Sequence, residues 1–354
     1  MVWPKKISEK LNIKYPLIQA PMFGVSSPEM AFAAARAGCL GSLALADLSA
    51  DHSIKLIRET KKLTDKDFAV NIFAHTLPVI TDSLKEKFVK AKTYIEALAE
   101  KHNMEVHLPN FEDITITSYH EQVDAAIQER CKIVSFTFGN LDEKSIQKLK
   151  ENGIIMIGTC TSVEEALLLE RSGIDIICVQ GIEAGGHRGT FDADPIPQIG
   201  GLSLFSQVYD SVKVPLIYAG GIYNSSTLLA VKNLGAEGFQ VGSILLASQE
   251  SVLKPFEKER LQKVNEKEIV LTRSFSGRYA RGITNKYIQT MENSEYILPY
   301  PYQNKLTQEL RRISKALNNV DFVSIWAGQS IHHYSEQSTE SILNKLIFEV
   351  ESIQ

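Results

Sequence analysis

Short apolar runs alternate with longer amphipathic stretches along most of the chain. This is the pattern of βαβ units that surround a parallel sheet. Most of the apolar runs are continuous rather than alternating, as expected of strands that are buried on both faces. The pattern predicts strands at Leu17–Ala20, Gly41–Ala46, Phe68–Phe73, Ile133–Phe138, Ile154–Cys160, Ile174–Gln180, Pro215–Gly220 and Gly238–Gly242.

The stretches between these strands carry signals for the start and end of helices. Ser27 and Pro28 begin one such stretch and Ser162 begins another, each ending at a glycine, and Asn224–Gly235 has the same punctuation. Eight alternating units within about 240 residues match the size of a (β/α)8 TIM barrel. An open doubly wound sheet would usually carry a G-x-G-x-x-G turn after its first strand, and 20–25 lack that spacing. We therefore predict an α/β fold of the (β/α)8 barrel type.

Two regions depart from the simple repeat. Residues 81–128 are long for one crossover, and we expect an inserted helical region outside the barrel. Residues 249–304 follow the eighth strand, and we expect a lid or substrate segment over the carboxyl ends of the strands. The predicted division is a barrel at 1–248, the lid segment at 249–304, and C-terminal helices at 305–354 that pack back on the barrel.

Composition narrows the class of protein. Of the 354 residues, 44% are hydrophobic and 23% charged, as in ordinary globular proteins, and a net charge of -4 gives no reason to expect nucleic acid or an anionic membrane as partner. The four cysteines are scattered without a C-x-x-C pair, so we expect no metal centre and no disulfide framework. The first residues lack a secretory apolar run, and no stretch reaches the roughly 18 apolar residues of a membrane span. We expect a cytoplasmic protein.

Glycine turns follow the last two predicted strands. Strand seven ends in Gly220-Gly221 before a helix start at Asn224, and strand eight ends in Gln240-Val241-Gly242-Ser243. Glycine lets the backbone approach an anion closely, and free N–H groups at a helix start point toward it. Barrels of this class commonly bind phosphate at these two loops. We therefore predict an anion site there rather than two tight turns alone.

A glycine-rich loop follows the sixth predicted strand and reads Gln180-Gly-Ile-Glu-Ala-Gly-Gly-His187-Arg-Gly189. Histidine titrates near neutral pH, which suits proton abstraction or stabilisation of a developing anion, so we predict that His187 is catalytic. Arg188 is equally consistent with an anchor for the loop or for a carboxylate. His75 is interpreted as structural. Asn71, at the end of strand three, is a candidate contact to a heterocycle, although a buried amide needs partners whatever its role.

These segments together resemble the nitronate monooxygenases, formerly called 2-nitropropane dioxygenases, along nearly the whole chain, and in particular the bacterial class that uses FMN without a metal. The matching segments are Tyr15–Met22, Val70-Asn71, Ser135–Gly139, Gln180–Gly189, Ala219–Ile222, Gly235–Gly238, Phe275–Arg278, Ala280–Gly282 and Trp326–Gln329.

The resemblance implies an FMN-binding barrel. It implies contacts to the isoalloxazine ring from Ala20, Met22, Asn71 and Gln180. It implies that the phosphate is held by Gly185, Gly220, Gly221, Gly242 and Ser243, with Gln240 and Val241 beside them. His187 matches the family's catalytic base. The implied reaction is oxidation of an alkyl nitronate, such as propionate 3-nitronate, by O2 to a carbonyl compound and nitrite. The expected partners are this substrate and O2, and a homodimer is left open.

The chain also departs from the family pattern. Phe23 stands where a small residue is usual after Met22, and Ala44–Asp47 replaces a Gly-x-Gly after strand two. Both changes narrow the expected mouth of the site. Two other functions stay open: an FMN-dependent enoyl-acyl carrier protein reductase that uses NADH, and a flavin-binding barrel without catalysis.

Overall fold

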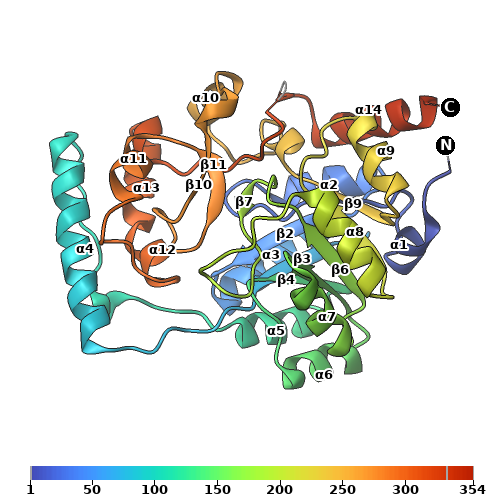
Figure 1. Cartoon of the computed structure of the whole chain (residues 1–354), viewed down its shortest axis with the longest axis horizontal. Coiled ribbons are helices and arrows are strands. Elements are labelled where there is room, and N and C mark those ends of the chain that lie inside the picture. Colours follow the sequence, from blue (N-terminus) through green and yellow to red (C-terminus); the bar gives the residue numbers. More distant parts are fainter. Residues whose placement is uncertain (1, 332–333, 354) are drawn as a thin grey trace.

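Eight parallel strands form the central sheet of the protein, in the order β1-β9-β8-β6-β5-β4-β3-β2. A computed structural model describes residues 2–331 and 334–353 (Figure 1). The eight strands are β1 (Leu17–Gln19), β2 (Ser42–Ala46), β3 (Ala69–Phe73), β4 (Ile133–Thr137), β5 (Ile155–Cys160), β6 (Ile176–Gln180), β8 (Leu216–Ala219) and β9 (Gly238–Val241). Each predicted strand is present, with ends that differ by no more than two residues.

The sheet closes on itself between β1 and the segment that leads into β2. Ile18 and Leu40 form an isolated parallel bridge. The Leu40 amide donates to the Leu17 carbonyl and the Gln19 amide donates to the Leu40 carbonyl, both at 2.9 Å. The predicted (β/α)8 barrel is therefore confirmed.

A ring of helices surrounds the barrel (Figure 1). The capping residues act as predicted: the side chains of Ser27, Ser162 and Asn224 accept hydrogen bonds from Met30 N, Glu165 N and Thr227 N. The ring consists of α2 (Pro28–Arg36), α3 (Ala50–Leu63), α5 (Tyr119–Gln128), α6 (Glu143–Glu151), α7 (Val163–Arg171), α8 (Gly201–Ser211), α9 (Ser225–Asn233) and α14 (Thr339–Ser352). The last of these contacts α2 and α9, so the end of the chain completes the ring.

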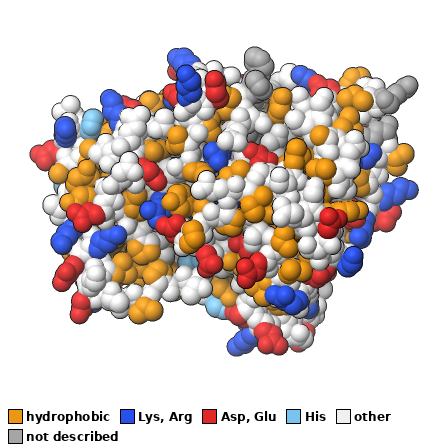
Figure 2. All heavy atoms as spheres, viewed as in Figure 1, with side chains coloured by type: hydrophobic (Ala, Val, Ile, Leu, Met, Phe, Trp, Pro, Cys, Tyr) orange, Lys and Arg blue, Asp and Glu red, His pale blue; other side chains and the backbone are white. Residues whose placement is uncertain are grey.

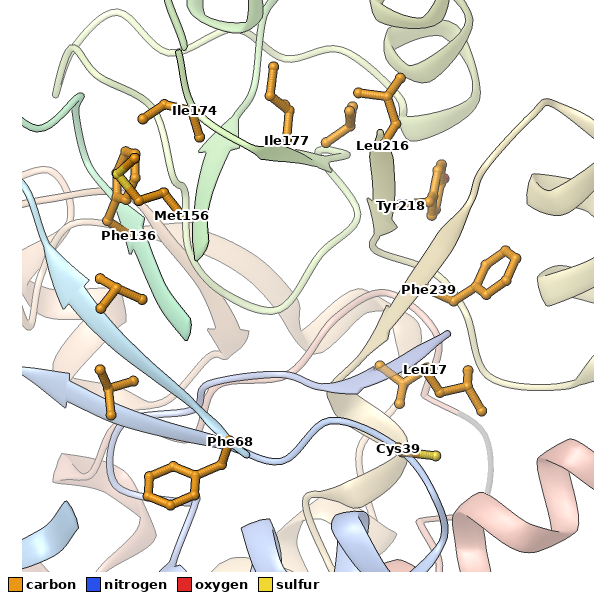
Figure 3. Close-up of a cluster of buried hydrophobic side chains, with 14 of the residues drawn as sticks. Leu17, Cys39, Phe68, Phe136, Met156, Ile174, Ile177, Leu216, Tyr218 and Phe239 are labelled. Atoms are coloured by element: carbon orange, nitrogen blue, oxygen red, sulfur yellow. The ribbon is translucent and has the colours of Figure 1, made fainter. Parts of the chain in front are cut away.

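Successive strand residues point to opposite sides of the barrel wall, as strand geometry requires. One set packs under the helices and includes Phe136, Met156 and Leu216 (Figure 3). The other set forms a separate cluster with Ile7 and Leu11, at and just beyond α1 (Lys5–Lys10). The amino-terminal segment thus packs with the second set of strand side chains.

A second apolar cluster is built from segments far apart in the sequence. It joins α4 (Asp82–Lys101) to helices of the C-terminal third, through residues such as Phe88, Phe275 and Leu310 (Figure 1). Its other helices are α11 (Lys286–Met291), α12 (Tyr302–Leu306) and α13 (Gln308–Ala316). The prediction of helices outside the barrel for 81–128 therefore holds for α4, whereas α5 contacts α3 and α6 in the ring.

The remaining elements link this cluster to the barrel. A three-stranded antiparallel sheet joins β10 (Ile269–Thr272) and β11 (Ala280–Ile283) to β7 (Gly186–His187). The other short elements are α10 (Pro255–Gln262), η1 (Phe111–Asp113), η2 (Ser243–Leu245), η3 (Glu266–Glu268) and η4 (Val320–Phe322). α14 packs back on the barrel, while α13 packs in the second cluster. The division of the chain at residues 248 and 304 stays a prediction.

The surface carries charges of both signs. On the face that Figure 2 shows, Lys and Arg side chains are interspersed with Asp and Glu side chains. In the part of the chain that the structure describes, no helix has the length and apolar character to cross a membrane.

Candidate active site

A large cavity lies where the carboxyl ends of the barrel strands meet segments of the C-terminal third. Its volume is about 1740 Å³ when the open mouth is included. The predicted site residues that line it are Ala20, Met22, Asn71, Gln180, Gly185, His187, Gly220, Gly221, Gln240, Gly242 and Ser243. Val241 does not line the cavity: its side chain is buried under the helices, and its carbonyl accepts a hydrogen bond from Ala20 N.

Backbone dominates one part of the cavity wall. Gly220 and Gly221 have φ values of 119° and 68°, in the region that side chains disfavour, so glycine is required by the backbone there. Ser243 accepts a hydrogen bond from Gly328 N at 2.9 Å, and Ser330 donates to the carbonyl of Gly221 at 3.1 Å. These contacts bring the 328–330 segment against both glycine turns. The wall suits a group that is held by main-chain donors, such as a phosphate.

Two amide side chains face the cavity from β3 and β6. Gln180 donates from Nε2 to the carbonyl of His187 at 3.1 Å and accepts from Gly189 N at 2.8 Å, so it fixes the loop that carries the histidine. Asn71 donates to Ser135 Oγ at 2.9 Å. Its Oδ1 has no hydrogen-bond partner among the described residues, and it is not enclosed by protein. Asn71 therefore offers an acceptor to a heterocyclic N–H group.

His187 is held in β7, opposite Ala280 of β11. Its Nε2 lies 2.8 Å from the hydroxyl of Ser276, and that hydroxyl lies 3.0 Å from the carbonyl of Arg278. We assign the proton of Ser276 to the carbonyl of Arg278, which can only accept, and Nε2–H of His187 then donates to Ser276. This arrangement leaves Nδ1 without a proton. Nδ1 has no partner among the described residues and is not enclosed, so its lone pair is available in the cavity.

The surroundings keep His187 neutral. Burial and the charges of Arg278 and Arg311 lower its pKa to about 3, with Asp47 acting weakly in the opposite direction. Aromatic rings account for much of the burial: the centroids of Phe138 and Trp326 both lie 5.5 Å from the imidazole. A neutral imidazole accepts a proton rather than donating one, which suits the role of base.

The charged residues near His187 in sequence support the loop. Arg188 is buried, and its guanidinium donates to the carbonyls of Gly181 at 2.6 Å and Gln180 at 2.9 Å. Glu183 accepts from the hydroxyl of Tyr218 at 2.8 Å and from Gly201 N at 3.0 Å. Neither charged side chain lines the cavity. Of the two duties left open for Arg188, the structure shows an anchor for the loop.

The remaining histidine and arginine candidates are also held by the protein. His75 is half-buried, contacts the ring of Tyr300 edge-on at 4.7 Å, and does not line the cavity. Burial lowers its pKa. Arg281 donates to the carbonyl of Ile182 at 2.9 Å, and Arg278 donates to the carbonyls of Thr190 and Phe191.

Several cavity residues were not predicted. They come mainly from the C-terminal third, whose position over the barrel mouth no periodic pattern reveals: Tyr300, Asn304, Arg311, Lys315, Ser324, Trp326, Gly328 and Ser330. Phe23 and Asp47, the two departures from the family pattern, both line the cavity. The Trp326–Gln329 match to the family was the available signal for part of this wall.

The fold is a barrel with a large cavity at the carboxyl ends of its strands, which is where enzymes of this fold hold their reacting groups. The family model "Nitronate monooxygenase" matches residues 5–349. A probable nitronate monooxygenase of Bacillus subtilis is 37% identical over 343 residues, which cover 96% of each chain. The chain belongs to the nitronate monooxygenase family and is an oxidoreductase of this family of flavoenzymes.

Solved structures give the same result. A nitroalkane oxidase from Streptomyces ansochromogenes has a TM-score of 0.86 and 30% identity, with 98% of this chain and 97% of that chain covered. FabK from Thermotoga maritima has a TM-score of 0.75 and 25% identity, with 99% and 97% covered. The likeness to the nitroalkane oxidase is therefore the stronger of the two.

Proposed function

We propose that the protein binds FMN in the cavity and oxidises alkyl nitronates, such as propionate 3-nitronate, with O2 to a carbonyl compound and nitrite. The observation that carries the proposal is the neutral His187, which presents an unprotonated Nδ1 to a cavity that also contains two glycine turns. Membership of the nitronate monooxygenase family supports the same reaction.

The residues present fit FMN. The main chain at Gly185, Gly220, Gly221, Gly242 and Ser243 would hold the phosphate, because four of these five positions are glycines with no side chain to cover the backbone. The free Oδ1 of Asn71 and the side chains of Ala20, Met22 and Gln180 would contact the ring, and Gln240 would lie beside the phosphate contacts. When bound, FMN would supply the redox chemistry between the nitronate and O2.

His187 would handle the proton of a neutral nitroalkane. Nδ1 would accept the α-proton, while Nε2–H keeps its bond to Ser276 and holds the ring in place. A group whose pKa is about 3 is a weak base, but the imidazolium and the nitronate formed beside it attract each other and offset the burial. A nitronate that is already ionised needs no such transfer. The site therefore favours ionised nitronates, for which His187 orients the substrate.

The apolar part of the wall would exclude water from the reacting atoms. Met22, Phe73 and Trp326 line the cavity, and Phe73 lies 6.2 Å from the imidazole between ring centroids. Exclusion of water strengthens the interactions between the imidazole and a bound anion. We propose that the reaction takes place in the cytoplasm and removes toxic nitronates. A homodimer is compatible with this function.

Two other functions were left open by the sequence. An NADH-dependent enoyl-acyl carrier protein reductase has less support, because FabK is less similar in structure and sequence than the nitroalkane oxidase. A flavin-binding barrel without catalysis is opposed by the free lone pair of His187 in the cavity.

The test is anaerobic mixing of the purified yellow protein with one reductant at a time. We expect propionate 3-nitronate to bleach the visible flavin absorbance and NADH to leave it unchanged. Bleaching by NADH alone would favour the reductase, and no bleaching by either reductant would favour the flavin-binding barrel without catalysis. Chromatography of the flavin released by heat identifies it, and FAD in place of FMN would contradict the cofactor assignment.

A further inference from the structure

One cation on the cavity wall lacks an acidic partner. Arg311 of α13 is half-buried and lines the cavity. Its Nη2 donates to the main-chain carbonyl and to the side-chain oxygen of Asn304, both at 2.8 Å, and its Nε donates to the carbonyl of Thr307 at 3.3 Å. All of these acceptors are neutral. Its Nη1 has no hydrogen-bond partner among the described residues and is not enclosed by protein.

The neighbouring cations are paired. Lys305 lies 2.8 Å from a carboxylate oxygen of Asp47, and Lys315 lies 3.1 Å from one of Glu257. Within the described residues, Arg311 forms no ion pair, so its charge is not neutralised by a direct contact. A partly buried charge with no acid in direct contact is costly, and the charge of Asp47, itself paired with Lys305, offsets this cost only in part. The cost is offset when an anion binds beside it.

Arg311 and His187 face the same cavity, and the charge of Arg311 is one cause of the lowered pKa of His187. Trp326, whose ring lies 5.5 Å from the imidazole, lines the cavity with both. Arg311 belongs to α13 in the second apolar cluster, not to the glycine turns of the barrel. It is therefore placed to contact a substrate whose reacting end lies at His187.

The geometry points to Arg311 as a specificity-determining residue that binds a carboxylate at the far end of the substrate. The planar guanidinium offers a carboxylate two parallel donors, which is the pairing that arginine makes best. This inference rests on the proposed function and adds that Arg311 is the residue that recognises the carboxylate of the substrate.

The test compares two nitronates that differ in this group. Propionate 3-nitronate carries a carboxylate and ethyl nitronate does not. We expect the wild-type kcat/KM to be at least about tenfold higher for propionate 3-nitronate. In Arg311→Gln, we expect KM for propionate 3-nitronate to rise roughly ten- to a hundredfold, with ethyl nitronate changed less than about twofold. The control is Arg312→Gln, because Arg312 is exposed and paired with Glu309.

Equal wild-type kcat/KM values for the two nitronates would overturn the inference. This comparison uses the wild type only, so it does not depend on whether a variant folds. An equal loss on both substrates in Arg311→Gln would also overturn it. Release of FMN by that substitution, with flavin retained in Arg312→Gln, would show instead that Arg311 holds the cofactor.

A binding measurement separates this inference from the proposed function. Succinate resembles propionate 3-nitronate in length and charge but has no nitronate to oxidise. We expect calorimetry on the FMN-loaded protein to show succinate binding that weakens at least about tenfold in Arg311→Gln and is unchanged in Arg312→Gln. Succinate binding of this kind without nitronate turnover would support the carboxylate site and contradict the proposed function. Nitronate turnover, together with succinate binding that the Arg311 substitution leaves unchanged, would support the proposed function and contradict the carboxylate site.

Discussion

The imidazole Nε2 of His187 lies 2.8 Å from the hydroxyl of Ser276, which is itself bonded to the carbonyl of Arg278 at 3.0 Å. The two residues are 89 positions apart in the chain. With the hydroxyl proton assigned to the carbonyl, the imidazole proton is on Nε2 and the lone pair is on Nδ1. Ser276 is thus a positioning residue that determines which ring nitrogen can act as a base.

Replacement of Ser276 by alanine removes this constraint. We expect Ser276→Ala to keep FMN and to lower kcat on a neutral nitroalkane about tenfold, the usual scale for loss of one hydrogen bond that orients a charged intermediate. Activity on an ionised nitronate should change by less than about threefold, since no proton is transferred. Steady-state kinetics with 2-nitropropane and with its pre-formed nitronate measures the difference.

The matched control is Ser274→Ala. Ser274 is also fully buried, but its hydroxyl donates to Glu292 at 2.7 Å and does not contact His187. Ser274→Ala should lower stability but should affect activity on the neutral nitroalkane and on the ionised nitronate equally. The same selective loss in both variants would show that the effect comes from general loosening of this segment.

Removal of the imidazole tests proton abstraction directly. His187→Asn should retain the flavin, because the proposed phosphate contacts are backbone groups, and those at Gly220, Gly221 and Gly242 belong to other segments. We expect activity on neutral nitroalkanes to fall about 100-fold or more, within the range for loss of a general base, and activity on ionised nitronates to fall far less. Equal losses on the two substrates would exclude the proton-abstraction role.

The half-buried His187 also makes stability depend on pH. The pKa of His187 is about 3 in the folded protein, against about 6.5 for an ordinary histidine, so the unfolded chain binds the proton more tightly. The stability that the neutral form provides is complete above about pH 6.5 and is lost as the pH falls toward 3. Between pH 7 and pH 5 the loss should be up to about 2 kcal/mol.

Urea unfolding at the two pH values measures this dependence. His187→Asn removes the titrating group, so its free energy of unfolding should fall by about 2 kcal/mol less than that of the wild type over the same interval. Other groups titrate equally in the two proteins and cancel in the comparison. An identical pH dependence would mean that the folded protein does not hold His187 in its neutral form.

The glycine turns can be tested through the flavin. Gly221→Val should release FMN, because a β-branched residue strains a backbone with φ of 68° and covers the main chain at the proposed phosphate site. Gly153→Val is a matched control: Gly153 has φ of 65°, has open space where a side chain would begin, and does not line the cavity. Both variants should lose stability, but only Gly221→Val should lose the yellow colour on gel filtration. Full retention of FMN would show that the phosphate lies elsewhere.

The barrel was predictable because its signals are local. Continuous apolar runs mark strands that are buried on both faces, and Ser27, Ser162 and Asn224 mark helix starts through hydrogen bonds within one turn. The direction of the Val241 side chain could also have been predicted from a local signal. Since strand side chains alternate, Gln240 faces the cavity and Val241 faces the helices.

The rest of the site depends on contacts between distant segments. β7 was not predicted because two residues form a strand only by pairing with β11, more than ninety positions away. Arg311 falls within the predicted C-terminal helices, and only the packing of α13 with α4 and α12 brings it to the cavity. Sequence patterns report periodicity and turns, but they do not report which charges lack a partner after folding.

Steady-state oxygen uptake with propionate 3-nitronate, with nitrite measured in the same samples and NADH oxidation run beside it, tests the central claim most directly. The account predicts oxygen uptake that depends on the nitronate, about one nitrite formed per nitronate consumed, and no comparable oxidation of NADH. Rapid NADH oxidation without uptake or nitrite from the nitronate would contradict it.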